Sequence, residues 1–208
     1  MSDRYKRQLS IISQDKMDVP IHVIGCGGIG SWTTLVLAKM GCSNIHVYDD
    51  DTVEDHNVAS QFFSEKDLDK YKRYALADSV YEQTGISIKP LENIKEEEIE
   101  NGIVIFALDS MEERIRLGEI YKDRDIYIID GRMGGLQLEV YNSPASSYLS
   151  TTVAPDKVDR DMCTARAICF TCVTISGLIA NYVRLKLLDK LKDGGITFGF
   201  EDVVLLKE

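Results

Sequence analysis

The sequence predicts an α/β fold, a Rossmann-like, doubly wound sheet in which parallel strands continue into antiparallel strands. Short β-branched runs alternate with helical segments, which is typical of parallel strands joined by crossover helices. A glycine-rich stretch, GCGGIG, follows the first of these runs and opens the first helical segment. Further along, LQLEVYN over 136–142 alternates apolar and polar residues, which indicates an antiparallel strand with one exposed face.

In the first half of the chain, apolar runs predict three strands separated by two helices. The run IHVIG is short, β-branched and ended by glycine, as in a buried parallel strand. Gly41 and Gly85 are placed to end the two helices, because glycine adopts the left-handed conformation found just after a helix. The predicted order is a strand over 21–25, a helix over 29–40, a strand over 44–49, a helix over 65–84 and a strand over 86–91.

The second half of the chain predicts further strands, a loop and a long helix. The predicted order is a strand over 102–109, a charged helix that ends near Tyr121, a strand over 125–131, the alternating strand, a loop, a helix over 164–190 and a closing pair of strands. The loop, at about 143–162, holds two of the four prolines and many small polar residues, which favours a flexible surface segment. No linker divides the chain, so we expect a single domain over 1–208.

Composition limits the class of function. The 208-residue chain has a formal net charge of −10 and scattered basic residues, so a nucleic-acid binder is not expected. No apolar run is long enough to span a bilayer, and the N-terminus lacks the apolar core of a signal peptide. We therefore expect a cytoplasmic protein without a membrane partner. The odd number of cysteines, five, favours free thiols.

The glycine loop predicts a phosphate site. Gly25, Gly27 and Gly30 occupy the three glycine positions of GxGxxG between a strand and a helix. Bare backbone can approach phosphate oxygens there, and the helix N-terminus offers unpaired N–H groups and a positive dipole end. Asp49, at the end of the second strand, is placed to accept hydrogen bonds from a ribose. The loop thus indicates an adenine nucleotide without saying which, and a merely tight turn is the alternative.

Four further features favour ATP over a redox dinucleotide. The stretch RYKRQ places two arginines and a lysine before the first strand, and residues 49–57 are strongly acidic. Lys72 lies in a basic cluster, KYKR, at the start of a helix. Asp109 follows the fourth strand at the carboxyl edge of the sheet, where a carboxylate beside phosphates is suited to hold Mg²⁺. The alternatives are a solvated surface lysine for Lys72 and a helix N-cap for Asp109.

These motifs together resemble a known family. GCGGIG, followed by DDDTVEDHNVASQ and then ALDSMEER, resembles the ubiquitin-activating superfamily, in particular its bacterial ThiF/MoeB/HesA branch. RYKRQ matches the RYxRQ opening of that family, and the resemblance covers most of the chain. It implies that the protein binds MgATP and adenylates a carboxylate, usually the C-terminal Gly-Gly of a ubiquitin-like or sulfur-carrier protein.

The resemblance also implies a role for each matching residue. Arg7, the second arginine of RYxRQ, would reach the phosphates of a neighbouring subunit, which implies a homodimer. Asp109 would position Mg²⁺. Asp51, in the acidic stretch, is a candidate from the residues themselves for a structural or metal-adjacent role. The other implied nucleotide-binding residues are the loop glycines Gly25, Gly27, Gly28 and Gly30, the ribose-binding Asp49, and Asn57 and Lys72 at the nucleotide and its phosphates.

The chain departs from the family pattern in three places. Ser60 stands where the family commonly has an arginine, so a phosphate contact is lost or is supplied by another residue. In FALDS, a phenylalanine and a serine replace an acid and an amide of the family's DxxDN element, leaving Asp109 as its acid. A single CxxC pair, Cys169 and Cys172, stands in place of the two pairs that hold zinc in many members, so no structural zinc is predicted.

Cys163 is the candidate reactive thiol. It lies in DMCTAR, ahead of the long helix, in the region where some family members form a thioester or persulfide with the activated partner. A helix N-terminus lowers the pKa of a nearby thiol, although an inert cysteine is the alternative. Arg132, beside glycines at the end of the fifth strand, is a candidate to steer a substrate carboxylate, with a simple turn as its alternative.

Residues and resemblance together predict an ATP-dependent adenylyltransferase that forms an acyl-adenylate on the C-terminus of a ubiquitin-like or sulfur-carrier protein. One alternative is a non-catalytic member of the same family that binds nucleotide or a partner without turnover. A second is an NAD-dependent Rossmann oxidoreductase, and a third is a family enzyme that adenylates a tRNA base or a peptide carboxyl.

Overall fold

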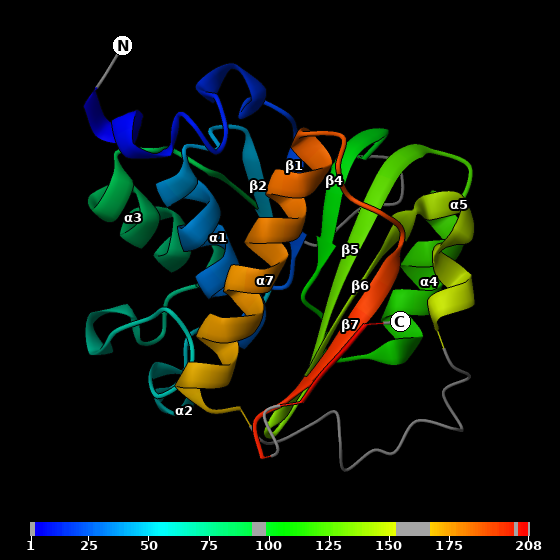
Figure 1. Ribbon diagram of the computed structural model, residues 1–208. Coiled ribbons are helices and arrows are strands. Elements are labelled where there is room, and N and C mark those ends of the chain that lie inside the picture. Colours follow the sequence, from blue (N-terminus) through cyan, green and yellow to red (C-terminus); the bar gives the residue numbers. More distant parts are fainter. Residues whose placement is uncertain (1–2, 93–98, 153–166, 202–203, 208) are drawn as a thin grey trace.

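The structure is a computed structural model that describes residues 3–92, 99–152, 167–201 and 204–207 (Figure 1). These residues form an eight-stranded sheet with the order β3-β2-β1-β4-β5-β6-β7-β8. The strands are β1 Ile21–Ile24, β2 Ile45–Tyr48, β3 Lys89–Leu91, β4 Asn101–Phe106, β5 Asp125–Gly134, β6 Gln137–Pro144, β7 Gly194–Gly199 and β8 Val204–Lys207. Pairing is parallel from β3 to β5 and antiparallel from β5 to β8, which confirms the predicted fold class.

The strand order reverses at β1. This strand pairs in parallel with β2 on one side and with β4 on the other. All four of its residues, IHVI, are buried, as expected for a strand covered on both faces. In a doubly wound sheet the chain leaves such a strand in opposite directions, and a crevice opens at the carboxyl ends of the strands there.

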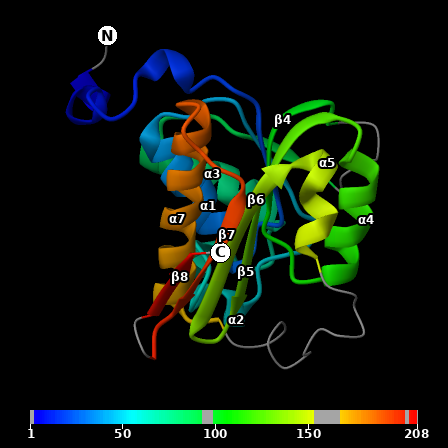
Figure 2. The same cartoon turned by 45° about the vertical axis from the view of Figure 1, so that its right-hand side comes forward.

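Helices cover both faces of the sheet (Figures 1 and 2). One layer consists of α1 Gly28–Met40, α3 Lys72–Thr84 and α7 Cys169–Leu187, and it encloses the larger core cluster. The other consists of α4 Met111–Tyr121 and the short α5 Ala145–Tyr148, which pack over the smaller cluster around Phe106. Gly41 and Gly85 end α1 and α3 in the left-handed conformation, with φ of 102° and 71°, as the sequence predicts.

The helix predicted over 65–84 is divided in the structure. A 3₁₀ turn, η3 Glu65–Asp67, comes first, and the Asp67 carboxylate accepts the N–H of Ser64 at its start. Asp69 then adopts a left-handed backbone with φ of 65°, which a right-handed helix cannot contain. The second helix therefore begins at Lys72 and directs its N-terminus toward the carboxyl ends of β1 and β2.

The structure also differs from the loop predicted over 143–162. Residues 143 and 144 complete β6, and α5 and the 3₁₀ turn η4 Leu149–Thr151 follow directly. The sequence pattern missed this because Ala145 and Tyr148 are buried among otherwise small polar residues. Residues 153–162, together with Cys163, lie outside the described part of the chain. The long helix predicted over 164–190 is described from Cys169 to Leu187.

The N-terminal segment lies at the edge of the sheet away from the carboxyl ends of the parallel strands. In η1 Asp3–Gln8, the side chains of Arg4 and Gln8 donate to the carbonyls of Thr84 and Met40, at the C-terminal ends of α3 and α1. A second 3₁₀ turn, η2 Gln14–Lys16, leads into β1. No helix in the described ranges has the length and apolar character needed to cross a bilayer.

Candidate functional site

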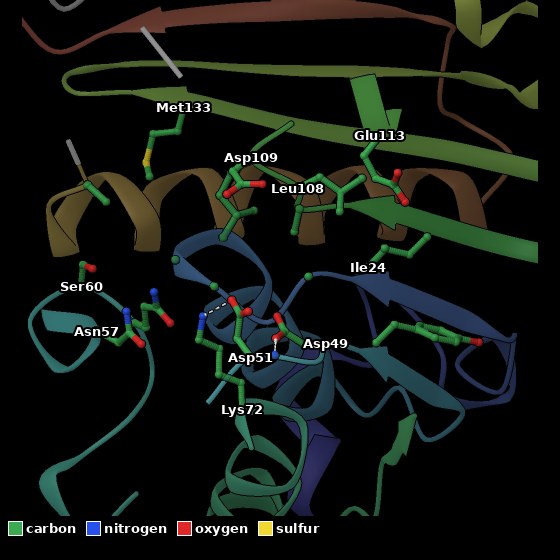
Figure 3. Close-up of a pocket in the computed structure, with 18 of the residues that line it drawn as sticks. Ile24, Asp49, Asp51, Asn57, Ser60, Lys72, Leu108, Asp109, Glu113 and Met133 are labelled. Atoms are coloured by element: carbon green, nitrogen blue, oxygen red, sulfur yellow. Dashed lines mark hydrogen bonds and ion pairs between the residues drawn. The ribbon is translucent and has the colours of Figure 1, made fainter. Parts of the chain in front are cut away.

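A pocket of about 980 Å³ opens at the carboxyl ends of β1, β2 and β4 (Figure 3). Its volume lies at the upper end of the roughly 300–1,000 Å³ that is typical of small-molecule sites. The pocket brings together most of the residues that the sequence predicts for nucleotide binding. Those that line it are Gly25, Gly27, Gly28, Asp49, Asp51, Asn57, Lys72 and Asp109.

The glycine loop turns so tightly that side chains are excluded from it. Gly25 has a φ of 94°, and a Cβ on it would lie 2.5 Å from the carbonyl oxygen of Ala107. A Cβ on Gly30 would lie 1.8 Å from the carbonyl oxygen of Gly25, so this glycine lets α1 pack on the turn. Gly27 is the N-cap of α1 and supplies no side-chain cap, which leaves the first N–H groups of α1 open to a ligand.

Asp49 is fixed by the loop that it faces. One carboxylate oxygen accepts the N–H of Cys26 at 2.6 Å, and the other accepts the N–H of Asp51 at 2.8 Å. Burial raises the pKa of Asp49 above its ordinary value, although these two hydrogen bonds oppose the shift. Each oxygen retains a further lone pair, so the carboxylate can still accept hydroxyl groups such as those of a ribose.

Lys72 is the lysine of KYKR that reaches the pocket. Its Nζ lies 2.8 Å from the carboxylate of Asp51, and only 9% of the lysine side chain is exposed, against 73% of Asp51. Lys70 instead pairs with Asp67, outside the pocket. Figure 3 shows Asp49, Asp51 and Lys72 together on one side of the glycine loop. Lys72 therefore places a buried positive charge beside the loop, with Asp51 as a solvent-exposed counterion.

Asn57 and Ser60 line the end of the pocket near α2 Asp55–Val58 (Figure 3). Asn57 is buried, and its side-chain oxygen accepts the N–H of Glu54 at the start of α2. Ser60 is buried as well, and its carbonyl accepts the indole N–H of Trp32. A serine at this position carries no charge, so Lys72 is the cation that this side of the pocket supplies in the described residues.

Asp109 lies across the glycine loop from Asp49 and Asp51 (Figure 3). Its side chain is exposed to the pocket, between β4 and α4. The N-cap of α4 is Ser110, whose hydroxyl accepts the N–H of Glu113 at 3.2 Å, so the helix-cap alternative for Asp109 is excluded. The described residues contain no group of three or more potential metal ligands. A lone carboxylate nevertheless suits Mg²⁺, which is commonly held by one or two carboxylates together with substrate phosphates.

A buried charge network forms the wall of the pocket on the β4–β5 side. We call Arg114, Asp130, Arg132 and Tyr148 the Asp130 network. Asp130 is fully buried and accepts from Arg114 Nε at 2.9 Å, from Arg132 Nε at 2.8 Å and from the Tyr148 hydroxyl at 2.8 Å. Burial raises the pKa of Asp130, but the two arginines outweigh it, and the pKa lies below its ordinary value.

The sequence predictions missed Arg114, Asp130 and Tyr148, and they included Arg132 only as a candidate. Arg114 and Arg132 both line the pocket, and Arg114 also donates to the carbonyls of Leu108 and Gly131, which joins the ends of β4 and β5. The available signal was the pair Asp130 and Arg132 at the end of a buried strand, because a charge there requires a partner.

Gly30 and Arg7 do not line the pocket, although Gly30 lets α1 pack on the turn beside it. Arg7 lies exposed in η1, at the opposite edge of the sheet, so it does not reach the pocket of its own chain. This position is compatible with the predicted role of Arg7 in a neighbouring subunit. Cys163 is outside the described residues. Cys26 and Cys172 are buried, and burial raises the pKa of both thiols, to about 11 for Cys172.

Comparison with curated proteins finds relatives with a similar sequence. The NEDD8-activating enzyme E1 catalytic subunit of Dictyostelium discoideum is 31% identical over 183 residues, which covers 76% of this chain and 41% of that protein. The corresponding subunit of Arabidopsis thaliana is 38% identical over 103 residues, which covers 46% of this chain and 23% of that protein. The chain therefore spans less than half the length of these curated relatives.

Solved structures show the fold at lower identity. The crystal structure of E. coli MccB with MccA-N7isoASN has a TM-score of 0.83 at 17% identity and covers 100% of this chain and 72% of that one. The structure of E. coli MccB with ATP has a TM-score of 0.76 at 16% identity and covers 100% and 71%. PaaA has a TM-score of 0.79 at 18% identity and covers 99% and 72%. The ThiF family matches residues 5–198, nearly the whole chain, and the protein belongs to the ThiF family.

Proposed function

We propose that residues 1–208 act as a single adenylation domain that binds MgATP and transfers AMP to a carboxylate. The observation that carries this proposal is the pocket itself, in which a bare glycine loop lies between Asp49 and Lys72 on one side and Asp109 on the other. The named relatives support it, since they are NEDD8-activating enzyme subunits and an MccB structure that contains ATP.

Each half of the pocket has a task in this reaction. The open N–H groups of α1 donate hydrogen bonds to phosphate oxygens, while the Asp49 carboxylate accepts hydrogen bonds from the ribose hydroxyls. Lys72 neutralises charge that develops on the phosphates, and Asp109 would hold Mg²⁺, which would supply further positive charge there. The carboxylate attacks the α-phosphorus, the bond to the β-phosphate oxygen breaks, and pyrophosphate leaves. The chain forms no covalent bond in this step and acts by holding two anions together.

The acidic lining of the pocket indicates that a bound triphosphate needs cations beyond those of the described residues. Lys72, Arg114 and Arg132 are the lysine and arginine side chains in the described lining, and the two arginines are both held by Asp130. The acidic residues that line the pocket outnumber them and are Asp49, Asp50, Asp51, Asp109 and Glu113. A triphosphate entering this acidic site needs Mg²⁺, and we propose that Arg7 of a second copy in a homodimer adds a further cation.

We propose that the substrate is the C-terminal Gly-Gly carboxylate of a ubiquitin-like or sulfur-carrier protein. The names of the curated relatives favour a ubiquitin-like substrate. The solved MccB structures include complexes with MccA, so the carboxyl of a peptide is the second candidate substrate. We further propose that the Cys163 thiol, after loss of its proton, attacks the acyl-adenylate and forms a thioester, with AMP as the leaving group.

Exchange of radiolabelled pyrophosphate into ATP tests the proposal. The purified chain is incubated with MgATP, labelled pyrophosphate and small proteins that end in Gly-Gly, and parallel reactions contain EDTA or the same proteins without their last two residues. We expect exchange that requires both Mg²⁺ and an intact Gly-Gly end. Binding of ATP without exchange would support a non-catalytic family member, and binding of NAD in place of ATP would support an oxidoreductase.

Asp109→Asn tests the proposed metal position, with Asp123→Asn as the matched control. Both side chains are exposed acids beside α4, but only Asp109 lines the pocket. We expect Asp109→Asn to lower the exchange rate roughly 100-fold or more, as for loss of a group that stabilises developing charge. The control should stay within about twofold of the wild-type rate. Equal rates for the two variants would contradict a metal role for Asp109.

A further inference from the structure

We propose that Arg132 binds the carboxylate that is to be activated, and that Asp130 and Tyr148 are positioning residues that hold Arg132 for this contact. The inference rests on the proposed function and assigns the substrate anion to one wall of the pocket.

The charge balance of the Asp130 network is the first argument. Asp130 carries one negative charge between two arginines, so the network has a net positive charge. Tyr148 does not change this balance, because burial and the neighbouring Asp130 raise the pKa of its hydroxyl and keep it protonated. Arg114 and Tyr148 are 2% and 1% exposed, so solvent screens the surplus charge weakly. The network therefore gives the β4–β5 wall a local positive charge in a pocket whose other charged residues are mainly acidic, and an anion can reach this wall from the pocket.

The hydrogen bonds of Arg132 leave donors for that anion. A guanidinium has five N–H donors. For Arg132, Nε and Nη2 donate to Asp130, and Nη1 donates to the carbonyl of Thr151 at 3.1 Å. Nη2 also donates a long hydrogen bond to the Thr151 hydroxyl at 3.5 Å, and Arg132 shares a hydrogen bond with the Tyr148 hydroxyl. Within the described residues this leaves one N–H of Nη1 for a ligand, and the long bond from Nη2 can be exchanged for a shorter one. A carboxylate is the anion whose two oxygens best match the planar donor pair of a guanidinium.

Arg132 is held rigidly for this contact. Its guanidinium lies 4.4 Å above the ring of Tyr141, and 13% of its side chain is exposed. Asp130 in turn is fixed from the other side by Arg114, which also donates to the carbonyls of Leu108 and Gly131. Few rotamers are therefore left to lose when a substrate binds, so the hydrogen bonds to it carry little entropy cost.

The position of Arg132 in the sheet argues for the substrate rather than the nucleotide. Asp49 follows β2, and the glycine loop follows β1, so a nucleotide bound through ribose and phosphates occupies the β1–β2 half of the crevice. Arg132 lies in β5, and β4, which Asp109 follows, separates β5 from β1 and the glycine loop. An attacking carboxylate must approach the α-phosphorus from the side opposite the leaving pyrophosphate. Lys72, the cation proposed for the phosphates, lies in the β1–β2 half of the pocket, so Arg132 in the other half is placed for the carboxylate.

The test compares a charged peptide end with a neutral one. A five-residue peptide that ends in Gly-Gly is titrated as its free acid and as its C-terminal amide, with and without Mg²⁺ and α,β-methylene ATP, and binding is followed by NMR. We expect the wild-type chain to bind the acid at least about tenfold more tightly than the amide, as for one charge-assisted hydrogen-bonded pair. Arg132→Gln should reduce this preference to twofold or less, and Arg132→Lys should retain part of it.

Controls separate this role from a structural one. Arg184→Gln removes an arginine that bonds the side chain of Asn181 on α7, and it should keep the full acid preference. In Arg132→Gln, binding of α,β-methylene ATP should stay within about threefold of wild type, which a general loss of structure would not allow. Arg132→Gln that retains the tenfold preference, or a wild-type chain without one, would overturn the proposal.

The proposed function and this inference fail in different ways. If the wild-type chain does not bind α,β-methylene ATP with Mg²⁺, the proposed function fails. The acid preference measured without nucleotide then still supports or overturns the role of Arg132.

Discussion

The glycine-loop main chain forms the wall of the pocket in its β1–β2 half, whereas charged side chains form the wall in its β4–β5 half. In the first half the backbone of Gly25, Gly27 and Gly28 lines the pocket, and the acid of its ion pair, Asp51, is exposed. In the second half, Asp130 is fully buried between Arg114 and Arg132. The shape of the first half therefore depends on glycines without side chains, while the stability of the second half depends on the balance of buried charges.

Removal of Asp130 should have the largest effect on stability, because it leaves two arginines without their shared counterion. Loss of one partner of a buried ion pair costs about 3–5 kcal/mol, so Asp130→Ala should lower the free energy of unfolding by that amount. Urea denaturation measures the change. Asp125→Ala, at the exposed start of the same strand, is the control and should change stability by less than about 0.5 kcal/mol. Equal losses of stability in Asp130→Ala and Asp125→Ala would contradict a stabilising role for the buried charge of Asp130.

Gly30→Ala tests the backbone half. The added Cβ would lie 1.8 Å from the carbonyl oxygen of Gly25, and both groups belong to the main chain, so neither can move aside easily. We expect a loss of about 3 kcal/mol in the free energy of unfolding, at the upper end of the cost of overpacking, together with weaker ATP binding.

Gly177→Ala is the matched control, because a Cβ on this glycine of α7 meets nothing within 4 Å. It should raise stability by roughly 0.5–1 kcal/mol, the difference between alanine and glycine in a helix. A Gly30→Ala variant as stable as the wild type would contradict the tight turn.

The two halves should also differ in how their stability depends on pH, because a buried histidine lies in β1. His22 is buried, and its Nδ1 lies 2.9 Å from the Tyr48 hydroxyl. Burial, followed by the positive charges of His46 and Lys89, lowers the pKa of His22 to about 4 from 6.5. The folded state thus resists a proton that the unfolded state accepts below pH 6.5, so stability is complete above that pH and declines toward pH 4.

The expected loss is about 2 kcal/mol in the free energy of unfolding between pH 8 and pH 5. Urea denaturation of the wild type and of His22→Gln at both pH values measures it, and the variant should show a smaller decline. The Asp130 network contributes no decline over this range, because the pKa of Asp130 lies below its ordinary value. Equal declines in the two proteins would assign the pH dependence to other groups.

The sequence was sufficient for the order of the strands and of the long helices α1, α3, α4 and α7, and for the β1–β2 half of the site. The glycines, Asp49 and Lys72 lie within or just after elements that the hydrophobic pattern marks, so their positions follow from the rule that strand ends share one edge of the sheet. The register within KYKR did not follow, because it depends on the left-handed Asp69, which delays the start of α3 to Lys72.

The β4–β5 half could not be derived in this way. Its pairing joins Arg114 on α4, Asp130 on β5 and Tyr148 on α5, and only the folded packing of α4 and α5 on the sheet brings them together. The burial of Tyr148 cannot be predicted from the sequence for the same reason. Residues 145–151 therefore have the composition of a loop, although they form helical turns.

Calorimetric titration with ATP in the presence of Mg²⁺ tests the central claim, that this pocket binds MgATP, most directly. We predict saturable binding at one site per chain, abolished by EDTA and unaffected by NAD. The absence of any heat with MgATP, or the displacement of ATP by NAD from the same site, would contradict the account.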